Sequence, residues 1–179
     1  MSTKKLPTLT FNAGEYVVYP THGVGKVSDI SKQTISGTEL EFLVVNFDKD
    51  RMTLRIPTSK LPSAGLRKIS DEKTMKEALD TLKGKAKVRR AMWARRAQEY
   101  ENKINSGNPV AVAEVIRDLY RKDNVAEQSY SERQIYEQAL ERLASEVSVY
   151  SQCSLEDANN KLFEILAQQK DSEQKEVAE

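Results

Sequence analysis

The 179-residue sequence has very little of the side-chain chemistry on which metalloproteins and many enzymes depend. It contains one cysteine, Cys153, and one histidine, His22. A single cysteine excludes an intramolecular disulfide, and one cysteine with one histidine cannot supply the four ligands of a structural zinc site. We therefore expect no bound metal and no other cofactor.

Long apolar runs are also missing. No stretch reaches the roughly 20 continuous apolar residues of a membrane span, and the N-terminal residues MSTKKLPTLTF lack the apolar core of a secretory signal. We expect a cytoplasmic protein without a membrane partner. The sequence has no long heptad repeat of the kind that predicts a coiled-coil dimer, so we expect a monomer. With 39% hydrophobic and 31% charged residues, the chain is polar but should fold.

The net charge of +1 conceals an uneven distribution of charges. From Asp123 to the end of the sequence, thirteen residues are acidic and five are basic, so this part should repel a phosphate backbone. Residues 83–96 contain no acidic residue and seven basic ones, namely Lys83, Lys85, Lys87, Arg89, Arg90, Arg95 and Arg96. Any nucleic-acid contact should centre on this segment, although such a run is also typical of a solvated helix.

The two halves of the sequence follow different hydrophobic periods. Four runs rich in Val, Ile, Tyr, Phe and Thr are separated by turn residues; they are EYVVYP (15–20), KVSDISKQTI (26–35), ELEFLVVNF (39–47) and MTLRIP (52–57). This pattern predicts a small, strongly bent antiparallel sheet or open barrel made of hairpins. After Pro62 the period becomes 3.6 residues, which predicts a helical bundle. The expected fold class is therefore α+β.

Capping signals locate the expected helices and the domain boundaries. Helices are expected at about 71–82 and 87–105, and three more should begin at Asn108–Pro109, at a capping box of Ser131 with Gln134, and at Ser154 with Asp157. We divide the chain into an N-terminal extension (1–10), a β domain (11–65), a helical domain (66–170) and a polar tail (171–179) that we expect to be disordered.

Groups suited to catalysis are few. His22 lies in a Gly-flanked turn with no Cys or acidic residue near it in sequence, so a packing or turn role is favoured over a hydrolase or nuclease site. Gly23–Val24–Gly25 is too short for a phosphate loop and precedes a strand, whereas such loops open helices. We expect a protein that is not an enzyme.

The only tryptophan, Trp93, lies within the basic run. In a helix, Arg89, Trp93 and Arg96 would lie near one another on one face, a combination suited to phosphates and bases. However, Trp93 also continues an apolar stripe, which is typical of a buried face and consists of Ala97, Tyr100 and Ile104. The periodicity alone favours burial. We nevertheless predict partial exposure, because Trp93 lies near the start of its helix.

Two segments resemble the CarD/CdnL family of bacterial transcription regulators, and the resemblance extends from about Phe11 to Gln169. GEYVVYPTHGVGKV, followed by TISG, LEFLVV and LRIP within residues 14–57, is similar to the RNA-polymerase-interacting domain that the family shares with the transcription-repair coupling factor. MWARR (92–96), followed by VAEVIRDLYRKD (112–123), is similar to the helical DNA-binding module of the family. Two motifs in this order and at this separation are specific, whereas YPxHG alone would be weak.

The resemblance implies an N-terminal Tudor-like antiparallel β domain that docks on the β subunit of RNA polymerase. It also implies a C-terminal all-α helical bundle that touches promoter DNA at the upstream edge of the bubble, largely independently of sequence, and stabilises the open complex. The implied polymerase contacts are Gln33, Thr34, Ile35 and Arg55. The tryptophan wedge of the family falls on Trp93, with Arg95 and Arg96 beside it, and the basic run adds Arg89 and Arg90. Gln33 and Gln98 stand where a basic residue and a lysine are expected in other members.

Two other functions stay open at this point. The chain could be an architectural DNA-binding protein that acts without polymerase, or an adaptor whose helical half binds another protein through Trp93. The first predicts tight binding to free duplex DNA. One basic cluster on a nearly neutral chain instead predicts weak binding.

Overall fold

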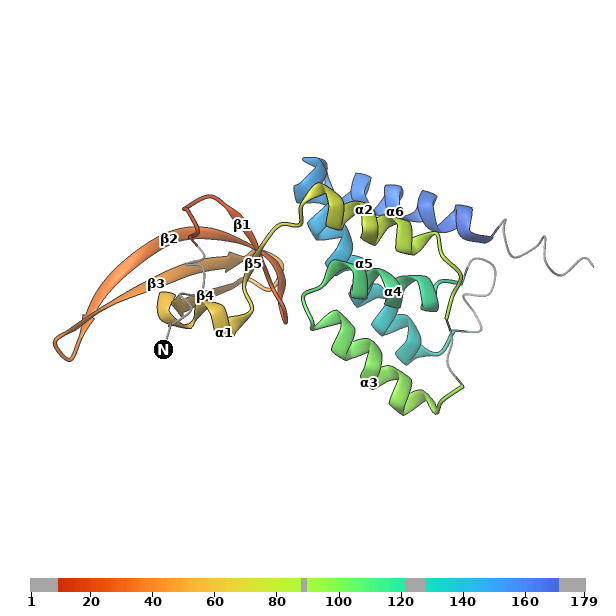
Figure 1. The fold of residues 1–179 in the computed structure, drawn as a ribbon, viewed down its shortest axis with the longest axis horizontal. Coiled ribbons are helices and arrows are strands. Elements are labelled where there is room, and N and C mark those ends of the chain that lie inside the picture. The colour runs from red at the N-terminus through yellow and green to blue at the C-terminus, as the bar shows by residue number, and fades with distance from the viewer. Residues whose placement is uncertain (1–9, 88–89, 122–127, 171–179) are drawn as a thin grey trace, which may run out of the picture. The chain divides into compact units, whose positions relative to one another are not determined.

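The computed structural model describes residues 10–87, 90–121 and 128–170 and divides into two compact units, one ending at Lys68 and the other beginning at Ile69 (Figure 1). The first unit holds the sheet and the second the long helices, which confirms the predicted α+β fold. The division falls at Lys68 and not at residue 65, because Arg67 and Lys68 pair with the sheet. The expected tail (171–179) and residues 1–9 of the expected extension lie outside the described residues.

The first unit is a five-stranded antiparallel sheet. Strands β1 (Tyr16–Tyr19), β2 (Gly23–Ile35), β3 (Thr38–Phe47) and β4 (Met52–Pro57) form successive hairpins, and β5 (Arg67–Lys68) pairs with β1. The spatial order is β4-β3-β2-β1-β5. The four predicted strands are confirmed. The structure adds β5, a short η1 (Thr58–Lys60) and α1 (Leu61–Ala64), none of which the sequence pattern predicted.

The pair β2–β3 forms the long curved hairpin of this unit (Figure 1). Its register runs from Lys26 opposite Asn46 to Ile35 opposite Thr38, with an irregularity after Val27. The turn at its tip is Ser36–Gly37, as predicted, and both residues have a positive φ, of 51° and 79°. Turns with positive φ at both central residues match the twist of a two-residue hairpin.

The hydrophobic core of the first unit lies on one face of the sheet. Its buried residues are Phe11, Val17, Val27, Leu43, Val45, Phe47, Ile56, Leu61 and Leu66. Gly25 lies against this core, where a Cβ would be 2.7 Å from both Phe47 Cε1 and Val45 Cγ1. Gly25 is therefore part of strand β2 and is required by close packing, which fits the rejection of a phosphate loop at this motif.

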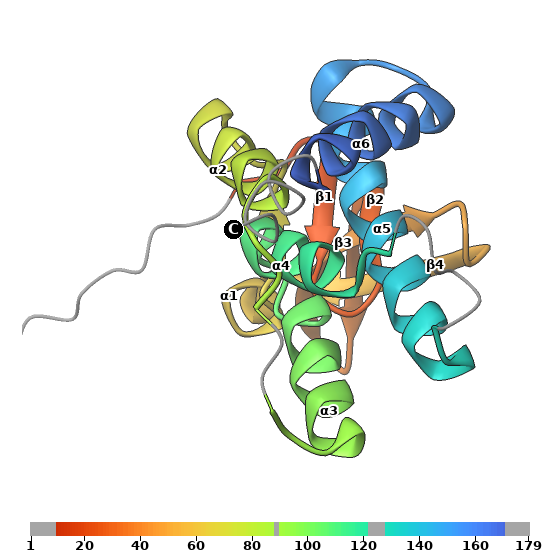
Figure 2. The same cartoon turned by 90° about the vertical axis from the view of Figure 1, so that its right-hand side faces the viewer.

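In its described residues the second unit has five helices, α2 (Glu72–Leu82), α3 (Trp93–Ile104), α4 (Pro109–Leu119), α5 (Tyr130–Ser151) and α6 (Leu155–Lys170). Helix α4 packs against α2, α3 and α5, and α6 packs against α5 and α2 (Figure 2). The apolar face of α4 is fully buried, through Val112, Ala113, Val115, Ile116 and Leu119. This central helix is the support on which α3 is held.

The helix starts follow the capping signals with one correction at α5. Asp71, Asn108 and Ser154 accept hydrogen bonds from backbone N–H groups at the starts of α2, α4 and α6, as expected. The capping box of α5 is Ser129 with Glu132 and not Ser131 with Gln134. The reason is that Ser129 has the extended backbone of an N-cap, whereas Ser131 already belongs to the helix.

The predicted start of α3 was wrong. The helix begins at Trp93 and not near Lys87. The Lys87 N–H donates a hydrogen bond to Asp118 Oδ1 of α4 at 2.9 Å. Met92 has φ −58° and ψ 143°, an extended conformation that marks the residue before the helix. Residues 90–92 therefore precede α3, and Trp93 is its first residue.

Candidate functional site

Trp93 is partly exposed, as predicted, and also packs on the core of the helical unit. Its ring lies 6.4 Å from the ring of Tyr100, measured between centroids and with an interplanar angle of 48°. Tyr100 and Ile104, further along the predicted stripe, are buried. The stripe is therefore the packing face of α3, and Trp93 occupies its end, where part of the ring reaches solvent.

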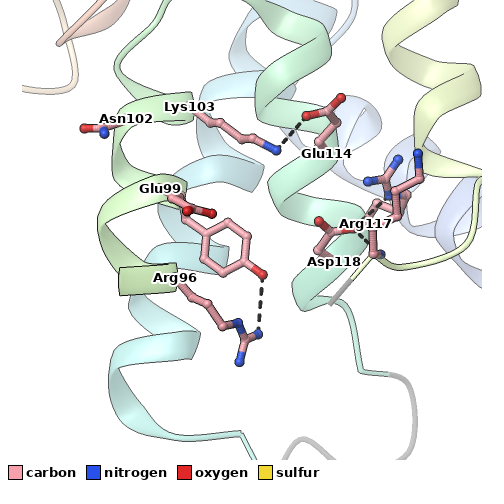
Figure 3. A pocket seen from close by; sticks show the side chains of 9 residues that line it. Arg96, Glu99, Asn102, Lys103, Glu114, Arg117 and Asp118 are labelled. Carbon is pink, nitrogen blue, oxygen red and sulfur yellow. Dashed lines mark hydrogen bonds and ion pairs between the residues drawn. The ribbon is translucent and has the colours of Figure 1, made fainter. Parts of the chain in front are cut away.

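Arg96 lies against these two aromatic rings. Its guanidinium carbon is 5.5 Å from the centroid of Trp93 and 5.8 Å from that of Tyr100. Nη2 of Arg96 donates a hydrogen bond to the Tyr100 hydroxyl at 3.4 Å (Figure 3). Nε of Arg96 is buried and has no hydrogen-bond partner among the described residues. Arg96 is thus directed at the protein and not only at solvent.

Arg95 and Arg90 are exposed, in contrast to Arg96. The Arg95 side chain is 80% exposed, and it forms a long ion pair, with Nε 3.8 Å from Glu99 Oε1. Such exposed pairs contribute little to stability, so the Arg95 guanidinium can exchange partners. Arg89, which was expected to share a face with Trp93 and Arg96, lies outside the described residues. Of that trio, the structure brings together Trp93 and Arg96.

Met92 is the residue of this region that sequence reasoning missed. It is 82% exposed, although it is large and apolar, and it immediately precedes Trp93. As the N-cap of α3 it makes no side-chain capping hydrogen bond. It was overlooked because it lies off the stripe of Trp93, Tyr100 and Ile104. Two features of the sequence could have indicated an exposed Met92: it is an apolar residue inside a basic run, and the helix start there has no Ser, Thr, Asp or Asn as a cap.

A cavity of about 460 Å³ lies beside these residues, between α3 and α4 (Figure 3). It is lined by charged pairs: Lys103 Nζ lies 2.7 Å from Glu114 Oε2, and the buried Arg117 Nε lies 2.8 Å from Asp118 Oδ1. The hydrogen bond from Lys103 lowers the pKa of Glu114 below its ordinary value. Both cations are already paired, and the pair of Lys103 with Glu114 joins α3 to α4, so the cavity is a weak candidate for a ligand site.

The residues predicted to contact polymerase lie in the sheet unit. Gln33, Thr34 and Ile35 form the end of β2 and are all exposed. In β2, only Gly23–Lys26 pair with β1, so within the described residues no strand pairs with this edge of β2 beyond Val27 (Figure 1). An unpaired edge presents backbone N–H and C=O groups to a partner strand.

Arg55 shares a sheet face with two of these residues but is not close to them in the register. Arg55 lies opposite Val44, which lies opposite Asp29, and alternation along β2 then places Gln33 and Ile35 on the same face and Thr34 on the other. Gln33 lies opposite Leu40, four positions along β3 from Val44, which is roughly 13 Å. On this face β3 also presents the half-buried Leu40, Phe42 and Val44.

His22 has the packing role that the sequence favoured, although it does have an acidic neighbour. Its ring stacks on Tyr19 at 5.5 Å and lies 5.6 Å from Phe47. Nδ1 of His22 is 3.7 Å from Asp50 Oδ2, a contact made through the β3–β4 turn and therefore invisible in local sequence. Among the described residues, no three His, Cys, Asp or Glu side chains gather as metal ligands would, and no helix is long and apolar enough to cross a membrane.

Comparisons with known proteins cover both units. Residues 11–70 match the family model of the CarD-like/TRCF RID domain, and residues 77–163 match that of the CarD C-terminal domain. YdeB of Bacillus subtilis (strain 168), a candidate transcription factor, is 30% identical over 139 residues, which cover 78% of this chain and 91% of YdeB. The NMR structure of the 72-residue N-terminal domain of Myxococcus xanthus CarD is 28% identical, covers 37% of this chain and 93% of that domain, and has a TM-score of 0.28.

Proposed function

Since this chain belongs to the CarD family of transcription factors, we propose that it binds the β subunit of bacterial RNA polymerase through its sheet unit and promoter DNA through its helical unit. The combined contacts stabilise the open complex during initiation. The CarD family is not a known enzyme family, and the chain acts by binding alone. It works in the cytoplasm as a monomer.

The observation that carries this proposal is the make-up of the start of α3. Met92 is 82% exposed, Trp93 is partly exposed, and the guanidinium of Arg95 is available beside them. Proteins that distort DNA insert apolar side chains, including Met, between base steps while cations contact the phosphates. Met92 and Trp93 with Arg90 and Arg95 supply both kinds of group at one exposed helix end.

Differential affinity explains how such a contact stabilises an open complex. Apolar insertion is less costly where bases are already unstacked, so the helix end binds the fork of a melted promoter more tightly than a relaxed duplex. A ligand shifts a two-state equilibrium by the ratio of its affinities for the two states. A difference of about 1.4 kcal/mol is therefore already a tenfold change in the population of open complexes.

Attachment to polymerase makes a weak DNA contact sufficient. The unpaired edge of β2 near Gln33–Ile35 is suited to accept a strand of the partner by backbone hydrogen bonds, and side chains on the adjoining face, including Arg55, would set specificity. Once the sheet unit is bound, the helical unit is held near the fork at a high effective concentration. Acidic residues beyond the helix start limit binding to DNA elsewhere.

The proposal is tested with the full chain, purified bacterial RNA polymerase and two promoter fragments, one fully paired and one with a mismatched bubble. We expect weak binding to both fragments without polymerase, and with polymerase a longer lifetime of the open complex. Tight binding to the paired fragment without polymerase would identify an architectural DNA-binding protein instead. Failure to bind polymerase at micromolar concentration would contradict the proposal as a whole.

A further inference from the structure

The two adjacent arginines at the start of α3 have different surroundings. Arg95 is directed at solvent, with 80% of its side chain exposed. Arg96 is half-buried, and its guanidinium carbon lies within 6 Å of two aromatic centroids, 5.5 Å from Trp93 and 5.8 Å from Tyr100. A charge-based interpretation of the sequence treats them alike, as two phosphate contacts. The structure separates them.

The hydrogen bonds of Arg96 point in the same direction. Nη2 donates to the Tyr100 hydroxyl at 3.4 Å, and Nε is buried with no partner in the described part of the chain, so these two nitrogens face the protein (Figure 3). Tyr100 is itself buried and belongs to the helical core. Arg96 therefore connects a fixed ring, Tyr100, to the partly exposed ring of Trp93.

We propose that Arg96 is a positioning residue that fixes the ring of Trp93 against Tyr100, whereas Arg95 makes the phosphate contact. This inference rests on the proposed function in that it assigns DNA contact to Trp93. A planar guanidinium can lie over an aromatic face and donate in its own plane, which the compact ammonium of lysine cannot reproduce. A ring held before binding loses less conformational freedom when it meets DNA.

The test uses the fact that Trp93 is the only tryptophan, so fluorescence excited at wavelengths that tyrosine does not absorb reports on this ring alone. The variants are Arg96→Lys and Arg96→Gln, with Arg95→Lys and Arg95→Gln as matched controls one residue away. Quenching by neutral acrylamide and the anisotropy decay of Trp93 measure its exposure and local motion. Thermal unfolding is recorded for each variant, and Arg96→Lys keeps the test valid should Arg96→Gln fail to fold.

We expect faster local motion and stronger quenching of Trp93 in both Arg96 variants, and an open-complex lifetime shortened by about two- to fivefold, the factor that one exposed cation–π contact supplies. Arg95→Lys should match the parent in the quenching and the anisotropy decay of Trp93, because the Arg95 side chain is directed at solvent. Arg95→Gln should bind DNA more weakly while its fluorescence is unchanged. Arg96→Lys that matches the parent in fluorescence and lifetime would overturn the positioning role and return Arg96 to a phosphate contact.

Failure of the proposed function gives a different pattern. If the Arg96 variants loosen the Trp93 ring but neither they nor Trp93→Ala shorten the open-complex lifetime, the DNA role of Trp93 is wrong and Arg96 has no functional ring to position. If Trp93→Ala shortens the lifetime and the loosened Arg96 variants do not, the positioning role alone is overturned.

Discussion

Arg55 lies directly opposite Val44 in the pairing of β3 with β4, and both side chains are on the sheet face that does not carry the core. Through Asp29, the next residue in this cross-strand row, the face continues along β2 to the residues near its tip. Arg55 therefore presents its side chain on this face, and it lies in β4, an edge strand of the sheet, two strands away from the unpaired edge of β2.

Arg55→Glu should weaken binding of the full chain to RNA polymerase by about 1 to 3 kcal/mol, the size of an interface hot spot, without unfolding the sheet. The exposed position of Arg55 is the reason that folding is preserved. Calorimetric titration against the isolated polymerase measures the affinity. Arg51→Glu is the control, since it makes the same charge change at an exposed residue in the β3–β4 turn. Equal affinities of both variants would remove Arg55 from the interface.

Met92→Ser should have opposite effects on stability and on function. Serine at an N-cap accepts a hydrogen bond from the first turn, so the substitution should stabilise α3, within a range of about 0.5 to 2 kcal/mol. The loss of an exposed apolar side chain should shorten the open-complex lifetime. Tyr130→Ser, at the exposed first residue of α5, is the control and should leave the lifetime unchanged. An unaltered lifetime for Met92→Ser would exclude Met92 from the DNA contact.

Arg95→Ala should weaken DNA binding by a similar factor for many sequences. The slope of the logarithm of the binding constant against the logarithm of the salt concentration should become shallower by about 0.9, the contribution of one phosphate contact. The matched control is Arg133→Ala on α5, because Arg133 also pairs through Nε with a Glu four residues on, at 2.9 Å. Fluorescence titrations at several salt concentrations give the slope. A loss confined to one base position would indicate direct readout instead of a phosphate contact.

Glu114→Gln should lower stability in a pH-dependent way. The hydrogen bond from Lys103 lowers the pKa of Glu114, so the folded state prefers the ionised carboxylate more than the unfolded state does. This contribution is fully present above the ordinary glutamate pKa of about 4.3 and is lost as the pH falls through the lower folded pKa. In urea unfolding at pH 7, the free energy of unfolding of Glu114→Gln should be lower than that of the parent by less than about 1 kcal/mol, since the pair of Lys103 with Glu114 is partly exposed. A difference in the free energy of unfolding between parent and variant that grows as the pH falls would contradict a lowered pKa of Glu114.

Much of the fold could be predicted from local sequence because the signals are local. Alternating Val, Ile and Phe residues, interrupted by Ser36–Gly37, specify the β2–β3 hairpin, and Asn108–Pro109 specifies the start of α4. The two-residue strand β5 is too short to have a period. It exists because Arg67 and Lys68 meet β1, a contact between distant parts of the chain.

The candidate site was only half predictable for the same reason. Its location, at a tryptophan in a basic run, is a property of the sequence. The N-cap of α3 is Met92, which makes no side-chain capping hydrogen bond, so the sequence has no capping signal at this position and periodicity placed the helix start too early. The different roles of Arg95 and Arg96 depend on where the Tyr100 hydroxyl lies, which no spacing rule provides.

Trp93→Ala tests the central claim most directly, because it removes the ring that joins the exposed helix end to the helical core. Since Trp93 is only partly buried, its loss should cost less than the roughly 3 to 5 kcal/mol of a core tryptophan, and the variant should stay folded and bind polymerase as the parent does. The decisive measurement is the lifetime of preformed open promoter complexes after challenge with a competitor, with parent protein, with Trp93→Ala and with neither. The account predicts that the parent prolongs the lifetime and that Trp93→Ala, at saturating polymerase occupancy, loses most of that effect. A folded, polymerase-bound Trp93→Ala that prolongs the lifetime as well as the parent does would contradict it.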